Sequence, residues 1–435
     1  MKGIIQFLEK YFVPVAGRIG SQRHLVAIRD GFVAIMPLII AGSMAVLINS
    51  LPIPAYQTLM TSVFGDGWKA FGGNVWMGSF AIFSLLVSFT IGYNLAKSYG
   101  SDAVSGGIIS VASLLAIMTP AAEAFAIPYG WVGAQGLFVA IIVAIISVEL
   151  YVRLCRSEKL VIKMPENVPP AVSKSFASLF PLMIVISIFS FIKIGTVAIG
   201  IENIHQAVFN AIQTPLSGFA NTMGSAVFIV FMNQLLWFFG LHGSNILEPV
   251  MQTLYLPAIE ANMAAFQAGT TIPHIVTKQF FDAFVHMGGS GTTIALIAAI
   301  YMASKSRHLK TMANLSAGPG LFNINESMIF GMPIVLNPVF IIPFVLGPVL
   351  ITIVSYLALA SGMVPKTIAL IPWTTPPIIG GYLATGSWRG SVLQIINLGI
   401  AIVTYIPFVI MAERLEEEST EKKQDSNTNL KKVAQ

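Results

Sequence analysis

The sequence predicts an all-α protein that crosses a membrane about ten times, with two irregular, re-entrant segments in its second half. Composition is the first reason: of 435 residues, 55% are hydrophobic and only 10% are charged, whereas a soluble domain is about a quarter charged. The second reason is that charge-free runs of spanning length recur along the chain. These runs are rich in Leu, Ile and Ala without strict alternation, which indicates helices rather than a barrel.

Each predicted span is a charge-free run long enough to cross ~30 Å of hydrocarbon, which takes about 20 residues. In chain order the runs lie within 31–65, 71–96, 103–122, 124–148, 175–192, 222–247, 283–304, 327–365, 367–388 and 390–411.

Basic residues predict the orientation of these spans. Before the first span, residues 4–20 have apolar residues at helical spacing beside Lys and Glu and lack a secretory cleavage pattern, so we expect an amphipathic surface helix. Cations precede the first span and follow the fourth, which makes both regions cytoplasmic under the positive-inside rule. The basic loop 305–310 fits this rule only if it is cytoplasmic, although counting spans places it outside.

We therefore expect a multi-pass membrane protein with both termini cytoplasmic and four regions. Residues 1–200 are predicted to form a five-helix scaffold, and 201–223, apolar at helical spacing with polar residues between, an interfacial linker helix. Residues 224–412 are predicted to form the substrate-binding domain. The tail 413–435 is rich in charge and poor in apolar residues, so we expect it to be disordered.

The second half contains two segments too polar and too broken by proline to face lipid, at 247–280 and 312–338. Irregular backbone at membrane depth is tolerated where protein covers it or where it lines a cavity. Two such breaks in one half point to the substrate site of a transporter.

Glu326 lies inside the second break, and between residues 311 and 365 it is the only ionisable residue besides Tyr356. A charge at bilayer depth costs at least ~2.5 kcal/mol on insertion scales, so we expect it to have a partner or a task. A carboxylate that locks helices together is the alternative, but no arginine lies in the same broken segment.

Three further polar patches lie in the same half, at 237–245, 281–293 and 372–388. A single histidine is usually a packing residue, but His242 and His286 fall in breaks of the same half as Glu326. We predict a functional site centred on Glu326 and His242, with the following as substrate-binding residues: Trp237, Ser244, Asn245, His286, Gly288, Gly289, Ser290, Asn325, Trp373, Thr374 and Trp388.

Such a lining suits a neutral, polyhydroxylated ligand, because carboxylate, imidazole and amide groups bond hydroxyls and indole faces pack on sugar rings. We expect no metal, since the candidate ligands lack the short spacings of zinc sites, and no cofactor, since the Gly-rich bend at 288–291 lacks a P-loop lysine. The scattered cations indicate no nucleic-acid partner. The single cysteine, Cys155, excludes an intrachain disulfide.

Four segments resemble a known family: "LLWFFGLHG", "FDAFVHMGGSGTT", "NINESMIFGMP" and "PWTTPPIIGGYLATG". They are similar to the signature segments of the membrane-embedded enzyme IIC of the bacterial phosphoenolpyruvate-dependent phosphotransferase system, lactose/cellobiose branch, and within it the diacetylchitobiose type. The likeness covers essentially the whole chain. One position differs, Ser327, where the family more commonly has Pro.

The resemblance implies a transport-coupled sugar phosphotransferase component in the bacterial cytoplasmic membrane. A separate cytoplasmic phospho-enzyme IIB would phosphorylate the C6 hydroxyl of an imported β-linked disaccharide. It also implies a homodimer of ten-helix protomers with two opposed re-entrant hairpins, in which the C-terminal bundle moves with the substrate as an elevator. By the same resemblance Glu326 accepts the hydroxyl proton, and His242 binds the sugar and orients that hydroxyl. His286 is a further hydrogen-bonding contact.

Two other functions fit parts of the sequence. In a proton-coupled sugar symporter, Glu326 would carry the coupling proton. A non-transporting sensor or scaffold is disfavoured by two irregular polar segments at membrane depth. The sequence does not distinguish diacetylchitobiose from cellobiose or lactose.

Overall fold

The computed structural model describes residues 2–50, 54–121, 126–162, 164–165, 168–332 and 334–433, and within these ranges every regular element is a helix. The predicted all-α class is therefore confirmed. The first half contains α1 (Lys2–Gly20), α2 (Arg23–Ser50), α3 (Pro54–Phe64), η1 (Asp66–Lys69), α4 (Ala70–Met77), η2 (Phe80–Ile82), α5 (Phe83–Ser98), α6 (Ala103–Ala116), α7 (Tyr129–Val132), η3 (Ala134–Gly136), α8 (Leu137–Cys155) and α9 (Pro170–Ala198).

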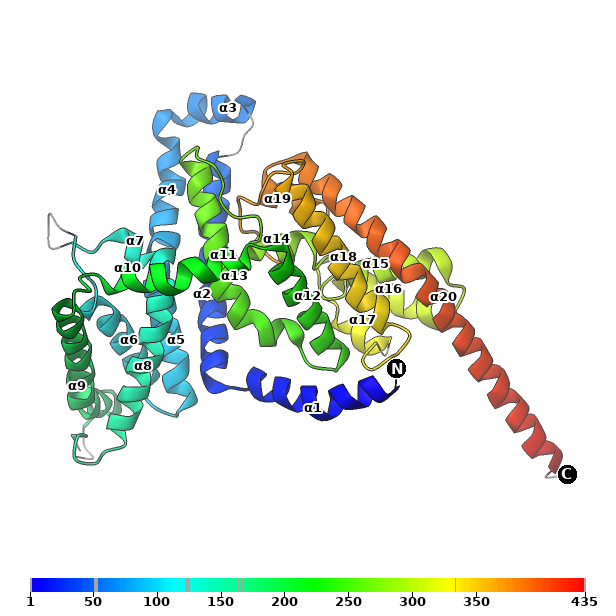
Figure 1. Cartoon of the computed structure of the whole chain (residues 1–435), viewed down its shortest axis with the longest axis horizontal. Helices are drawn as coiled ribbons and strands as arrows, with labels where there is room; N and C mark the ends of the chain where they lie inside the picture. Colours follow the sequence, from blue (N-terminus) through cyan, green and yellow to red (C-terminus); the bar gives the residue numbers. More distant parts are fainter. Residues whose placement is uncertain are drawn as a thin grey trace.

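Helices α2, α5, α6, α8 and α9 pack together as one bundle at one end of the molecule (Figure 1). Small residues allow the closest contact, between α5 and α6: a Cβ on Gly92 would lie 2.6 Å from the carbonyl oxygen of Gly106 and 2.0 Å from Ser110 Oγ. Glycine and serine at helix contacts let apolar helices approach closely where lipid supplies no hydrophobic drive.

A helical segment crosses from this bundle to the second half (Figure 1). It consists of α10 (Ile204–Val208), the π turn η4 (Phe209–Gln213) and α11 (Thr214–Ala220). It occupies the region predicted as a linker helix, and it meets α12 (Met223–Phe238) at a bend of 77°. Thr222 marks the bend, since its hydroxyl accepts the amide N–H of Ser225 and caps α12.

The second half packs α12, α15, α16, α18, α19 and α20 into another group (Figure 1). The long α13 contacts both α2 and α12, and so lies between the two groups. After α12, the helices are α13 (Gly243–Gln267), α14 (Lys278–Phe284), α15 (Thr293–Ala303), α16 (Arg307–Leu321), α17 (Glu326–Gly331), α18 (Ile341–Ala360), α19 (Ile379–Thr385) and α20 (Trp388–Val433).

Six helical segments in the described ranges are long and apolar enough to cross a membrane, or seven if the bent pair around residue 221 is one span. Two further apolar helices, α6 and α15, are shorter than a span. The chain is thus built as a multi-pass membrane protein. The expected number of about ten exceeds the six or seven segments that meet this test.

The two irregular segments differ from each other in the structure. Residues 247–267 are part of the continuous helix α13, even though it contains Pro249 and Pro257, and the chain leaves helical geometry only at 268–277. Both prolines are buried, so packing holds the helix together where proline alone would break it. The second segment is broken as expected, between α16 and α17, where Asn323 has a φ of 63°.

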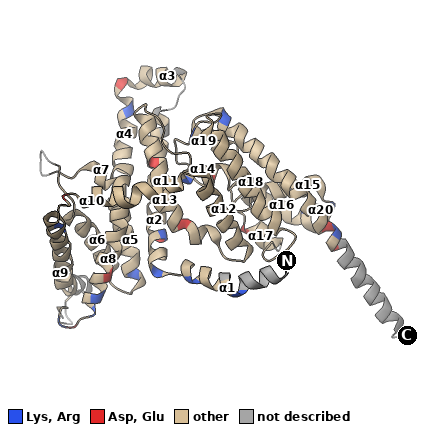
Figure 2. Ribbon diagram, in the orientation of Figure 1, with Lys and Arg blue, Asp and Glu red and all other residues tan. Residues whose placement is uncertain are grey.

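Lys and Arg are concentrated at the end of the molecule along which α1 runs (Figure 2). The basic loop at 305 lies beside the last helix, since the Lys305 amide N–H donates to Glu413 Oε1 at 2.9 Å and Ser306 Oγ donates to Glu416 Oε2 at 2.9 Å. That helix, α20, continues to Val433 through the segment where we expected disorder. The Ala, Glu, Lys and Arg residues there are strong helix formers.

Candidate functional site

A cavity of about 570 Å³ opens between α2, α12, α13 and the broken segments of the second half. It brings together residues that are far apart in the sequence. Predicted site residues that line it are Trp237, His242, Ser244, Asn245, His286, Gly289, Ser290, Asn325, Glu326 and Trp373.

Glu326 and His242 face each other in this cavity. The imidazole Nε2 lies 3.7 Å from the carboxylate Oε1, and both side chains are partly open to water. The other ring nitrogen, Nδ1, accepts the amide N–H of Asn245 at 3.2 Å and caps α13. An Nδ1 that accepts leaves the proton of the neutral ring on Nε2, so His242 presents an N–H donor toward Glu326 and the cavity.

The His242 ring packs against the Trp237 ring at the end of α12. The two rings are 4.3 Å apart between centroids. The buried indole donates from Nε1 to Ser244 Oγ at 3.3 Å, and Ser244 is 3.0 Å from Ser290 Oγ. Ser290 Oγ also accepts from Asn233 Nδ2 at 3.1 Å. This hydrogen-bonded chain therefore holds one wall of the cavity in a single arrangement.

The Gly-rich bend forms a second wall, directly against the segment that carries Glu326. Gly289 has a φ of +88°, and a Cβ at this position would lie 2.6 Å from Asn325 Cγ. Asn325 Nδ2 donates to the Ser290 carbonyl at 2.9 Å. Glycine is thus required at 289 both by the left-handed backbone and by the closeness of the Asn325 side chain.

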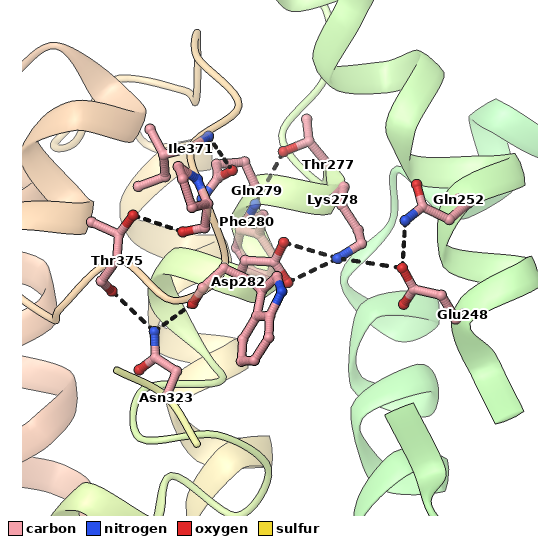
Figure 3. A network of polar contacts seen from close by, with 12 residues as sticks. Glu248, Gln252, Thr277, Lys278, Gln279, Phe280, Asp282, Asn323, Ile371 and Thr375 are labelled. Carbon is pink, nitrogen blue, oxygen red and sulfur yellow. Dashed lines mark hydrogen bonds and ion pairs between the residues drawn. The ribbon is translucent and has the colours of Figure 1, made fainter. Parts of the chain in front are cut away.

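The Asn323 side chain hydrogen-bonds two other segments, the Gly-rich bend and the loop at 373–375. Its Oδ1 accepts the amide N–H of Gly288 at 2.7 Å, and its Nδ2 donates to the carbonyls of Trp373 at 2.6 Å and Thr375 at 3.0 Å (Figure 3). Gly288 therefore supports the site through its backbone and does not line the cavity. Trp373 does line it, and its side chain is half exposed.

Two other predicted residues, Thr374 and Trp388, do not line the cavity. Trp388 begins α20 and is 66% exposed. His286 lines the cavity, and its buried Nδ1 has no hydrogen-bond partner among the described residues. A ligand hydroxyl that reached this nitrogen would satisfy it.

Asp282, in the polar patch 281–293 that the sequence singled out, belongs to a charged network on the α13–α14 side of the cavity that sequence reasoning did not predict. Lys278 Nζ is 2.9 Å from Asp282 Oδ2 and 4.0 Å from Glu248 Oε1, and Glu248 also accepts from Gln252 (Figure 3). All four side chains line the cavity. Lys278 and Glu248 were visible in the sequence as signs of a polar segment, and the spacing of Lys278 and Asp282, one helical turn, was the available signal.

Sequence reasoning also missed Arg29, Asp30 and Asn233, which line the cavity. Arg29 was counted among the cytoplasmic cations before the first span, and Asp30 was given no role. Asn233 is a buried amide within the apolar helix α12, and that isolation was the signal.

The cavity can hold a neutral molecule of many hydroxyls, since amides, hydroxyls, imidazoles and two indoles line it. Near Glu326 it can also take a proton from a hydroxyl that His242 orients. Among the described residues, no three His, Cys, Asp or Glu side chains are grouped as a metal site would need.

Comparisons with known proteins show which family the chain resembles. A family model described as "Phosphotransferase system, EIIC" matches residues 29–348. The chain is 42% identical to the lichenan permease IIC component of Bacillus subtilis, over 96% of each chain. It is 41% identical to the cellobiose-specific EIIC component of Geobacillus stearothermophilus, over 94% of each chain.

One solved structure is similar along nearly the whole chain. It is the crystal structure of the transporter ChbC, the IIC component of the N,N'-diacetylchitobiose-specific phosphotransferase system. The TM-score is 0.91 at 41% identity, over 95% of this chain and 99% of that one.

Proposed function

Because this chain belongs to the EIIC family of the phosphotransferase system, we propose that it imports a β-linked disaccharide and presents its C6 hydroxyl to phospho-enzyme IIB. Its relatives are named for lichenan, cellobiose and diacetylchitobiose, which share β-linked sugars. A cavity of about 570 Å³ has room for one disaccharide.

The observation that carries the proposal is the pairing of Glu326 with His242 in a cavity that also holds Trp373. A carboxylate beside an imidazole N–H can bind one hydroxyl from both sides: His242 Nε2–H donates to the hydroxyl oxygen, and Glu326 accepts its proton. The half-exposed Trp373 ring offers a flat apolar surface for the C–H face of a sugar ring.

Phosphoryl transfer needs little more than this from the membrane component. The transferred group passes between two oxygen or sulfur atoms in line, so positioning and charge stabilisation supply most of the acceleration. Glu326 removes the proton as the hydroxyl oxygen bonds to phosphorus. The dianionic product no longer matches a cavity whose hydroxyl-binding carboxylate is negative, which favours its release.

The proposal includes the assembly and orientation expected from the sequence: a homodimer with both termini cytoplasmic. The concentration of Lys and Arg at the α1 end (Figure 2) supports that end as cytoplasmic. The basic loop at 305 then lies on the same side, because it bonds Glu413 and Glu416 of α20.

Uptake by proteoliposomes tests the function. We expect cellobiose to enter only when the vesicles contain phosphoenolpyruvate and the soluble phosphotransferase proteins including enzyme IIB, and to appear inside as the 6-phosphate. A proton-coupled symporter would accumulate free cellobiose with a pH gradient alone. Such accumulation, without the soluble proteins, would refute the proposal, and no transport under either condition would favour a sensor or scaffold.

A further inference from the structure

The cavity contains two full cations, Arg29 and Lys278, and they are held in different ways. Lys278 is 8% exposed and lies between two carboxylates that are themselves largely covered. Removing these carboxylates from Lys278 would leave buried charges unpaired, which is costly. Lys278 therefore stays paired with these carboxylates, and through Glu248 it links α14 to α13.

Among the residues that the structure describes, Arg29 has a single acidic ion-pair partner, and its side chain is more open to water than that of Lys278. Its Nε and Nη2 both lie 2.8 Å from Asp30 Oδ1, and the Asp30 side chain is 42% exposed. An ion pair so open to water contributes little, and either partner can exchange it for another at small cost. Of the two cavity cations, Arg29 is the one that can accept a new anion.

Arg29 faces the same space as the reacting hydroxyl would occupy, because it lines one cavity with His242 and Glu326. Gly31, two residues later, brings α2 directly against α5: a Cβ there would lie 2.7 Å from Ile91 Cγ1. The next residue, Phe32, is fully buried. The part of α2 that carries Arg29 is therefore packed closely against α5.

The Asp30 carboxylate can turn toward a second hollow when Arg29 binds another anion. Asp30 lines this hollow, of about 390 Å³, on the α5 side of α2, together with Thr90, Tyr93 and Asn94. The Tyr93 hydroxyl and the second Nδ2–H of Asn94 can hydrogen-bond a carboxylate that has turned away from the main cavity.

We propose that Arg29 binds the phosphoryl group as it passes from enzyme IIB to the sugar, and so serves as a catalytic residue of the transfer. This proposal depends on the proposed function. Guanidinium is suited to the role, because its fork of N–H donors matches the oxygens of a phosphoryl group and remains charged throughout.

The step balances without any further reactant. The donor is the phosphocysteine of enzyme IIB, the acceptor is the sugar C6 hydroxyl, and no group is oxidised or reduced. The S–P bond breaks and its electron pair stays on the cysteine sulfur as thiolate. The O–P bond forms, the hydroxyl proton moves to Glu326, and Arg29 neutralises charge on the transferred oxygens.

Arg29→Gln and Arg29→Lys in the full-length protein test the proposal, with single-turnover transfer from phospho-enzyme IIB to cellobiose as the readout. We expect Arg29→Gln to slow transfer on the order of 10²- to 10³-fold, the usual effect of losing one preorganised charge-stabilising group, while cellobiose affinity changes little. Arg29→Lys should recover part of the rate, because it keeps the charge without the fork. Arg153→Gln, an exposed arginine at an ion-pair distance from Glu149, is the matched control and should transfer normally.

Binding of cellobiose 6-phosphate separates this role from a structural one. We expect Arg29→Gln to weaken it at least ~10-fold and Asp30→Asn, which removes the competing carboxylate, to strengthen it. If Arg29 merely paired with Asp30, both variants would change binding in the same direction, and the proposal would be wrong. Normal transfer by Arg29→Gln would also overturn it. Failure of the wild type to transfer would instead refute the proposed function.

Discussion

The neighbour of Glu326 is a histidine, and this choice decides what the carboxylate can do. A lysine or arginine at the same distance would hold it as a permanent ion pair, whereas a neutral imidazole 3.7 Å away leaves it free to accept a proton. The two side chains are attached to separate elements, the cap of α13 and the start of α17. A hydroxyl between them would be bound from both elements at once.

Replacing Glu326 by Gln tests the proton-accepting role. The amide keeps hydrogen-bonding capacity but is not a base, so we expect phosphorylation of cellobiose to be abolished while its dissociation constant stays within a few-fold. Calorimetric binding and transfer from phospho-enzyme IIB are the two measurements. Phosphorylated product at the normal rate would remove the assigned role.

His242 has two functions in the structure, and two substitutions can separate them. His242→Ala removes both the cap of α13 and the Nε2 donor, so we expect weaker sugar binding and a loss of about 1 kcal/mol in stability. His242→Asn can still cap the helix, so it should lose sugar affinity but retain thermal stability. Equal melting temperatures for Ala and Asn would show that the cap contributes nothing.

The sequence predicted these residues because they stand out from their surroundings. Glu326 and His242 are polar groups in apolar segments. Arg29 was missed because a cation close to the start of a span has a simpler explanation, membrane orientation. Asp30, beside it, was given no role. Only the fold shows that α2 turns these charges toward the cavity.

At the scale of elements, the cavity is shaped by backbone geometry as much as by side chains. The Gly-rich bend between α14 and α15 contacts the turn between α16 and α17, and the asparagines at 323 and 325 bond its backbone. Neither segment could keep its shape alone, since each uses left-handed residues that its neighbour holds in place.

Gly289→Ala tests this dependence between segments. The added Cβ would meet Asn325 at 2.6 Å on a backbone of φ +88°, so we expect displacement of the Glu326 segment and at least tenfold weaker cellobiose binding. Gly347→Ala is the control, because no atom lies within 4 Å of its Cβ position in the middle of α18. Unchanged binding by Gly289→Ala would mean that the two segments are not coupled.

Sequence patterns located these elements better than they described them. Proline content predicted a break throughout 247–280, but α13 is continuous across Pro249 and Pro257. Packing against α2 and α12 decided the outcome there, and no local pattern contains those contacts. The break before α17 was predictable because Gly, Pro and Asn occur together in it.

For the whole molecule, hydropathy established a multi-pass protein but not the number of spans. Charge-free runs gave about ten, while helices of spanning length and hydropathy number six or seven in the described ranges. The difference arises because α6 and α15 are apolar but short, and because α12 is joined to the preceding segment by a sharp bend. Run length alone cannot distinguish a straight helix from a bent pair.

Cysteine labelling tests the proposed orientation with the two ends of one helix. In a Cys155→Ser background, we expect Arg156→Cys, after α8, to react with a membrane-impermeant maleimide only from the cytoplasmic side. Tyr129→Cys, before α8, should react only from outside; both positions are exposed. The Cys155→Ser chain itself has no cysteine and serves as the unlabelled control. The reverse pattern would invert the topology.

The contact between Trp237 and His242 has a practical consequence. Indole emission responds to a neighbouring imidazole and to the water around it. Trp237, which contacts His242, and Trp373 both line the cavity. Only six tryptophans occur in the chain, so two of them form a large part of its ultraviolet signal. The protein thus carries an intrinsic optical reporter of cavity occupancy, readable in real time without any attached dye.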